Sequence, residues 1–159
     1  MRKIILLPLI VFSFMFIIAG CKEEENPVIP PSEHFEPEGW VLTGETQNLL
    51  LVVWQGEIRN NWNSAEINDT LFTAINTLTE NISVSFLDSD MNPLQAPGDA
   101  DYTFNWVITD TSYFDVAQGS DKWKFQLRGQ VPGLTTLELQ VLHQGHADVR
   151  TPKIPVKVN

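Results

Sequence analysis

Apolar residues occupy every second position in many segments from Trp40 onward, which is the pattern of half-buried β-strands. The clearest case is ISVSFL (82–87), where Ile82, Val84 and Phe86 share one face of a strand. The same alternation returns in YTFNWVIT (102–109), KWKFQLR (122–128), TTLELQV (135–141) and KIPVKV (153–158). Short strands at a spacing of roughly 10 to 20 residues are typical of a β-sandwich.

Turn-forming residues separate these segments, as in DSDMNPLQAPGD (88–99), QGSD (118–121) and VPG (131–133). The sequence contains no long amphipathic helical pattern, and the Thr-rich and Asn-rich segment 64–80 favours a short strand near Leu71 to Thr73. We therefore expect an all-β chain with Trp106 in its core.

Two segments outside this series suggest a further hairpin. Residues 34 to 63 contain apolar runs near Trp40 to Thr43 and near Leu49 to Trp54. We expect these runs to pair as an added N-terminal hairpin that covers an edge of the sheet.

Residues 70 to 158 resemble a bacterial immunoglobulin-like domain. The resemblance rests on FNWVITDTSYFDV (104–116), where a tryptophan strand precedes an Asp-Thr-Ser turn, and on FQLRGQVPGLTTLELQV (125–141), where a glycine-centred turn precedes the penultimate strand. It implies a seven-stranded immunoglobulin-like β-sandwich whose usual role is adhesion, spacing or binding, without shared catalytic residues. We accordingly expect residues 39–159 to form this domain, with the N-terminal hairpin as an addition.

The start of the chain is typical of a secretory signal peptide. Arg2 and Lys3 are followed by an uninterrupted apolar run from Ile4 to Ile18, which is too short and wrongly flanked for a membrane-spanning helix. The sequence Ile18-Ala19-Gly20-Cys21 resembles a bacterial lipobox, in which the cysteine becomes the lipidated first residue of the mature chain. We therefore expect residues 1–20 to be a lipoprotein signal peptide and Cys21 to carry the lipid.

Residues 21–38 are rich in Glu and Pro and lack a hydrophobic period, which predicts a flexible tether. Lys22 and the three glutamates after it resemble the export signal of bacterial surface lipoproteins. We expect an outer-membrane lipoprotein of the bacterial cell envelope, and the export signal implies exposure on the cell surface.

Charge and cysteine usage narrow the list of partners. The net charge is −10, and without residues 1–20 it is −12, from 8 basic and 20 acidic residues. Such a chain is poorly suited to nucleic acid or to anionic lipid headgroups, so the acyl chains of Cys21 would have to supply the membrane attachment. Cys21 is the only cysteine, which excludes an intramolecular disulfide and a cysteine-ligated metal cluster.

We expect no enzymatic activity, because the chain has no nucleophile elbow, phosphate loop or metalloprotease motif. The leading prediction for function is a lipid-anchored, non-enzymatic envelope module that binds an envelope protein or a small ligand through its loops.

The first alternative is a metal-binding or metal-handling lipoprotein. In VLHQGHADVR (141–150) a two-residue turn at Gln144-Gly145 would make His143 and His146 direct partners. Counting strands back from the C-terminus places the loop after Leu87 at the same end of the sandwich as this turn. In addition, an H-x-E pair lies just before the first strand. The candidate ligands are His143, His146, Asp148, Asp88, Asp90, His34 and Glu36. Mixed imidazole and carboxylate ligands suit zinc, copper or nickel.

Simpler interpretations of the same residues remain open. The two histidines also fit a solvated hairpin tip, and Asp148 would face apolar Val141 in the simplest register. Asp88 and Asp90 lie in DSDMN, where aspartates often form turns through their own backbone.

The second alternative is a glycan-binding module that uses Trp62. The segment RNNWNS places this tryptophan among Asn60, Asn61 and Asn63. An exposed indole beside amides can stack on a sugar face and hydrogen-bond its hydroxyl groups. The competing interpretation is that Trp62 packs under its own loop.

Overall fold

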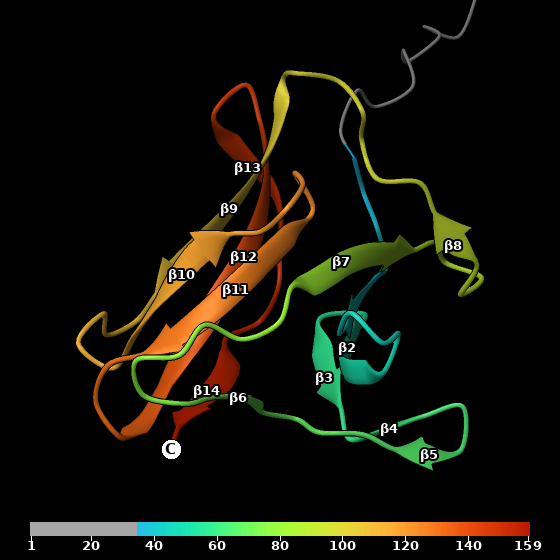
Figure 1. Ribbon diagram of the computed structural model, residues 1–159. Coiled ribbons are helices and arrows are strands. Elements are labelled where there is room, and N and C mark those ends of the chain that lie inside the picture. Colours follow the sequence, from blue (N-terminus) through green and yellow to red (C-terminus); the bar gives the residue numbers. More distant parts are fainter. Residues whose placement is uncertain (1–34) are drawn as a thin grey trace, which may run out of the picture. The chain divides into compact units, whose positions relative to one another are not determined.

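The structure is a computed structural model that describes residues 35–159, shown in colour in Figure 1. These residues belong to one compact unit, which covers Ser32–Asn159. The predictions for the signal peptide, for the lipidation of Cys21, for most of the tether and for His34 lie outside the described residues. In residues 35–159 no helix is long and apolar enough to cross a membrane.

The described chain is all-β, as the alternation predicts. Its strands are β1 (Gly39–Thr43), β2 (Leu49–Trp54), β3 (Glu57–Arg59), β4 (Asn61–Trp62), β5 (Ala65–Glu66), β6 (Leu71–Thr73), β7 (Ile82–Leu87), β8 (Pro93–Leu94), β9 (Tyr102–Ile108), β10 (Phe114–Gln118), β11 (Lys124–Gly129), β12 (Gly133–His143), β13 (His146–Arg150) and β14 (Ile154–Val158). The five segments with clear alternation become β7, β9, β11, β12 and β14, and the short strand near Leu71 becomes β6.

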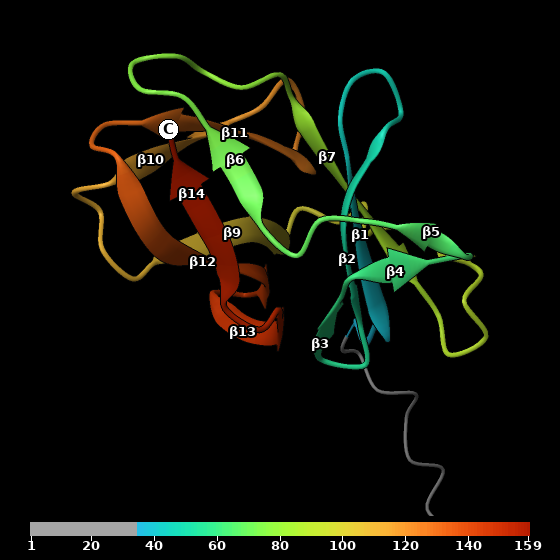
Figure 2. The same ribbon diagram turned by 90° about the horizontal axis from the view of Figure 1, so that it is seen from below.

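The strands form two main sheets that pack as a sandwich (Figures 1 and 2). One sheet has the order β10-β11-β7-β1-β2-β3, with β8 paired to β7. In the other, β12 pairs with β9 on one side and with β13 and β14 on the other, and β6 pairs in parallel with β14. This order is compatible with an immunoglobulin-like fold, because β1-β7-β11-β10 and β9-β12-β14 occupy the places of its ABED and CFG sheets.

The predicted N-terminal hairpin is confirmed as β1 and β2. It covers the edge of β7 by pairing with it, so that Trp40 opposes Phe86. The hairpin also contributes to the core, because Trp40, Leu42 and Leu51 belong to the main buried cluster. It is therefore part of the sandwich and widens one of its sheets.

The main core lies between the two sheets and contains the apolar faces that the alternation predicts. Phe86, Phe114 and Phe125 are its largest fully buried side chains. The prediction that Trp106 lies in the core is only partly right, because Trp106 is half-buried and packs against the margin of the cluster. β9 is an edge strand, so the indole has neighbouring strands on one side only.

A second, smaller apolar cluster covers the opposite face of the sheet that contains β1 and β2. Its buried residues are Val52, Trp54 and Leu87. Trp62 and Ile67 pack against them from β4 and from the segment after β5. Both faces of β2 are therefore covered, which explains why LLLVVW is a continuous apolar run. This second cluster positions the candidate site.

Candidate binding site

Two tight turns bring Trp54 and Trp62 together. Gln55 and Gly56, with φ angles of 50° and 76°, join β2 to β3, while Asn63 and Ser64, with φ angles of 50° and 67°, join β4 to β5. Positive φ at both central positions is the mark of a type I′ hairpin turn. Each tryptophan immediately precedes one of these turns, so the indoles lie at the ends of adjacent hairpins.

The two indoles form one side of an open groove. Their ring centroids are 6.0 Å apart and their planes are inclined by 52°. Trp54 is 6% exposed, whereas Trp62 is half-buried and rests on the Val52–Trp54–Leu87 cluster. Trp62 therefore packs against residues of other strands, and not only under its own loop, and it also lines the groove.

The groove has a volume of about 390 Å³, which lies within the usual range of ligand pockets, about 300–1,000 Å³. Its lining residues are Trp54, Arg59, Asn61, Trp62, Asn63 and Met91. Arg59 Nη1 lies 3.2 Å from Glu57 Oε2, and Asn61 Nδ2 donates a hydrogen bond to Asn60 Oδ1 at 3.1 Å. The groove thus combines an aromatic surface with amide groups and a cation that already has a carboxylate neighbour.

Sequence reasoning identified Trp62 and its asparagines but missed three residues of this groove. Trp54 reads as a strand residue of the core, and its position directly before Gln55-Gly56 is the only local signal that it lies at a hairpin end. Arg59 is one more strand residue in the sequence. Met91 comes from the turn after β7, which only the tertiary fold brings close.

The hairpin that carries two histidines forms as predicted. His143 and His146 are direct partners in the β12–β13 pairing, and Gln144 and Gly145 have φ angles of 50° and 85°. The register shifts between Val141 and Leu142, so that Asp148 is the extra residue of a β-bulge. The bulge lets Val141 pair with Val149 and removes the conflict between an aspartate and an apolar partner.

Asp148 and His143 lie together at this hairpin. His143 Nδ1 is 3.5 Å from Asp148 Oδ2, and the two side chains are 14% and 7% exposed. The imidazole also stacks on Tyr102, with ring centroids 4.4 Å apart and planes inclined by 6°. His146, on the other hand, is exposed. The structure thus builds an imidazole–carboxylate pair supported by an aromatic ring.

The other candidate ligands do not join this pair. Asp88 Oδ1 accepts hydrogen bonds from the backbone N–H groups of Asp90 and Asn92, both at 2.9 Å. The Asn92 hydrogen bond is the main reason why the pKa of Asp88 lies below its ordinary value. Asp88 is therefore a turn former, and Figure 1 shows the β7–β8 turn apart from the β12–β13 hairpin. The segment that does contact the β12–β13 turn is the end of the loop before β9, because the Gln144 N–H donates a hydrogen bond to the Asp101 carbonyl at 2.9 Å.

Within residues 35–159, no three His, Cys, Asp or Glu side chains are placed to hold a metal ion. Glu36 is exposed, and His34 lies outside the described residues. One imidazole and one carboxylate are fewer than the three protein ligands of a catalytic zinc site. Among the described residues, the tryptophan groove is therefore a better candidate for a functional site than a metal centre at the histidines.

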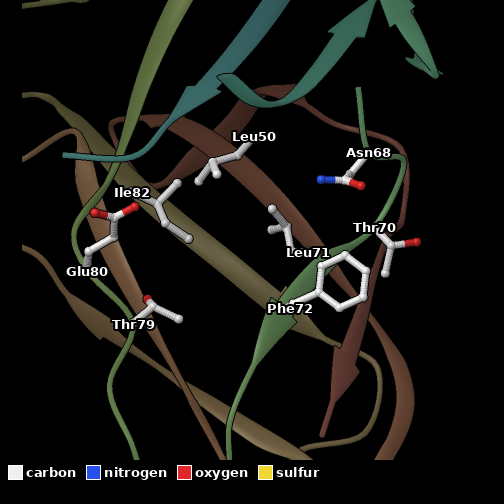
Figure 3. Close-up of a pocket in the computed structure, with 8 residues that line it drawn as sticks. All are labelled: Leu50, Asn68, Thr70, Leu71, Phe72, Thr79, Glu80 and Ile82. Atoms are coloured by element: carbon white, nitrogen blue, oxygen red, sulfur yellow. The ribbon is translucent and has the colours of Figure 1, made fainter. Parts of the chain in front are cut away.

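A second pocket lies where β6 faces the start of β7, and Figure 3 shows its lining. Leu50, Leu71, Phe72 and Ile82 form its apolar walls, and its polar residues are Asn68, Thr70, Thr79 and Glu80. Its volume is about 200 Å³, below the usual range for ligand pockets. The tryptophan groove is therefore the better candidate for a ligand site.

No protein-family model matches the chain, and no curated protein is significantly similar to it. The strand pairing establishes that the described chain is an all-β sandwich. The case for a function consequently rests on the geometry and chemistry of the Trp54–Trp62 groove.

Proposed function

We propose that this chain is a lipid-anchored, non-enzymatic carbohydrate-binding module of the bacterial cell envelope. The observation that supports the proposal is the pair of indoles in an open groove, 6.0 Å apart and flanked by asparagine amides. Aromatic rings and a few placed polar groups are the usual constituents of a small-molecule site.

A sugar ring suits this groove chemically. Its face of C–H groups can pack on an indole. Its hydroxyl groups can both donate and accept hydrogen bonds with the side-chain amides of Asn61 and Asn63. Arg59 adds donors, but Glu57 beside it offsets its charge. Together with the net charge of −10, this favours an uncharged glycan over an acidic one.

The lining of the groove favours binding over hydrolysis. None of the described residues that line it is an aspartate or glutamate, whereas most glycosidases use two carboxyl groups on either side of the scissile bond. A module that holds a glycan near the membrane needs only affinity and an anchor. We therefore assign the groove a role in recognition.

The anchor in this proposal is the lipid on Cys21. The first strand begins at Gly39, so the Glu-rich and Pro-rich segment between Cys21 and this strand would connect the sandwich to the membrane. Polyproline-like segments span about 3.1 Å per residue. A segment of this kind would hold the sandwich away from the bilayer surface.

Metabolic labelling with a palmitate analogue tests the anchor. The wild-type chain should be labelled, because Cys21 follows Ile18-Ala19-Gly20 at the end of an apolar run. A Cys21→Ala variant should carry no label and should leave the membrane fraction. Equal labelling of the variant and the wild type would show that the lipid is not on Cys21.

A glycan array tests the ligand class. The detergent-solubilised full chain should bind a restricted set of uncharged glycans, because the groove is short and its polar groups are few. The proposal would be refuted if no glycan were retained, or if retention depended only on the charge of the glycan. In that case an envelope protein would become the better candidate partner.

A further inference from the structure

Strand β9 lies at an edge of its sheet and pairs only with β12 among the described strands. The N–H of Thr109 donates to the Thr136 carbonyl at 3.0 Å, which fixes the phase of the antiparallel ladder. Because hydrogen-bonded positions alternate, the backbone groups of Thr103, Asn105 and Val107 face β12. Those of Phe104, Trp106 and Ile108 point to the outer edge, where no described strand meets them.

The other edges of the two main sheets carry features that hinder pairing with another chain. β3 carries Glu57 and Arg59, β10 carries Asp115, and β8 begins with Pro93. β13 has a bulge at Asp148, and β6 is only three residues long. Short strands, charges, prolines and bulges are the usual protections of sheet edges.

β9 has none of these protections. Its sequence YTFNWVI contains seven residues without a charge or a proline, and its pairing with β12 has no register shift. Aromatic and β-branched residues make up most of it, and these residue types favour extended pairing. An edge strand with these properties is a template for another strand.

The flank of β9 is also open. A hollow of about 480 Å³ lies beside its first half, lined by Tyr102, Thr103 and Phe104 of β9 and by Gln118 at the end of β10, among other residues. In the second half, Val107 is 49% exposed. The hollow is also lined by Gly98 and Ala100 of the loop before β9. The N–H of Tyr102 already donates to the Asp99 carbonyl in this loop at 3.3 Å, so the positions of β9 that remain open to another strand are Phe104, Trp106 and Ile108.

We propose that this edge pairs with β9 of a second copy of the chain, antiparallel about a two-fold axis at Asn105. In this register Phe104 opposes Trp106 of the partner subunit, and the outward-facing backbone groups of both positions hydrogen-bond across the interface. Thr103 then lies opposite Val107 of the partner subunit. The central position of YTFNWVI is Asn105, so the pairing leaves no overhang at either end of the strand.

Two copies with a net charge of −10 each repel one another, which opposes self-association in general. β9 carries no charged residue, so pairing along this strand places no two like charges opposite each other. An isologous contact of this kind closes on itself, so it produces a dimer and no filament.

The dimer would join the two β9–β12 sheets into one continuous sheet. It would also place two copies of any ligand site on one assembly, which raises avidity for a repetitive ligand without a new contact. This inference rests on β9 alone and holds whatever ligand the tryptophan groove binds.

Cysteine cross-linking in the full-length chain tests the register. Thr103 and Val107 of the partner subunit form a non-hydrogen-bonded pair, with Cα atoms about 4.5 Å apart, which is within disulfide range. A Thr103→Cys, Val107→Cys double variant treated with diamide as oxidant should therefore run as a dimer on a non-reducing gel. Within one chain the two positions are about 13 Å apart along the strand, so they cannot bridge each other.

The matched controls are the two single variants and the wild type. Thr103→Cys alone and Val107→Cys alone should stay monomeric. In the proposed register the cysteine of either single variant lies opposite an unchanged residue of the partner subunit, so no disulfide can form there. The wild type reports any cross-link through Cys21. Both residues are exposed in the chain, so the substitutions leave the core intact. A monomeric double variant, or single variants that cross-link as efficiently as the double one, would overturn the proposal.

Discussion

Replacement of Phe86 by alanine should lower the free energy of unfolding by about 3–5 kcal/mol, the usual cost of emptying an aromatic core position. Phe86 is 1% exposed. Its ring lies in edge-to-face contact with Phe35, Trp40 and Trp123, with centroid distances of 4.8, 4.9 and 5.3 Å. Because β7 pairs with both β1 and β11, the cavity would loosen the centre of the larger sheet.

Urea unfolding of the solubilised chain, followed by tryptophan fluorescence, measures this loss. The matched control is Phe72→Ala, since Phe72 is 48% exposed and its removal should cost much less than that of Phe86. Similar losses for the two variants would contradict the assignment of Phe86 to the core. Trp106→Ala should fall between them, because Trp106 lies at the margin of the cluster.

Replacement of Trp62 by alanine should weaken glycan binding by about 2 kcal/mol, which corresponds to a roughly 30-fold rise in Kd. The substitution removes the aromatic surface that Trp62 presents to the groove, together with its contact with Trp54. The affinity should be measured by isothermal titration with a glycan selected on the array. Trp62→Phe should retain part of the affinity, because a smaller aromatic surface remains.

Phe72→Ala is the control for this second prediction as well. Phe72 is an exposed aromatic residue outside the groove, so its removal should leave Kd unchanged. A loss of affinity in this control as large as that in Trp62→Ala would show that the effect is not local to the groove.

The strands were predictable because burial on one face of a strand imposes a period of two on the sequence. Leu137, Leu139 and Val141 in β12 are all fully buried, as the alternation requires. The same pattern cannot say where a strand lies within a sheet. Trp106 lies on the face of β9 that points to the core, as predicted, but β9 is an edge strand, so Trp106 is only half-buried.

The candidate sites were predictable only as far as local turns determine them. The Gln144-Gly145 turn follows from the sequence, and it sets His143 opposite His146. The expected approach of Asp88 fails because the chain turns back directly after β7, and β8 pairs with Phe86 and Leu87. Trp54 was missed because its run LLLVVW is buried on both faces, and only the position of β4 shows what covers the second face.

If a glycan occupies the Trp54–Trp62 groove, its binding should change the indole N–H signals of the two tryptophans in the NMR spectrum. The chain has tryptophans at positions 40, 54, 62, 106 and 123, so each indole can be assigned by single substitution and followed by NMR during a titration. Saturable shifts are expected for Trp54 and Trp62, with the other three signals unchanged. Shifts confined to Trp40, Trp106 or Trp123 during saturable binding would show that the glycan binds outside this groove.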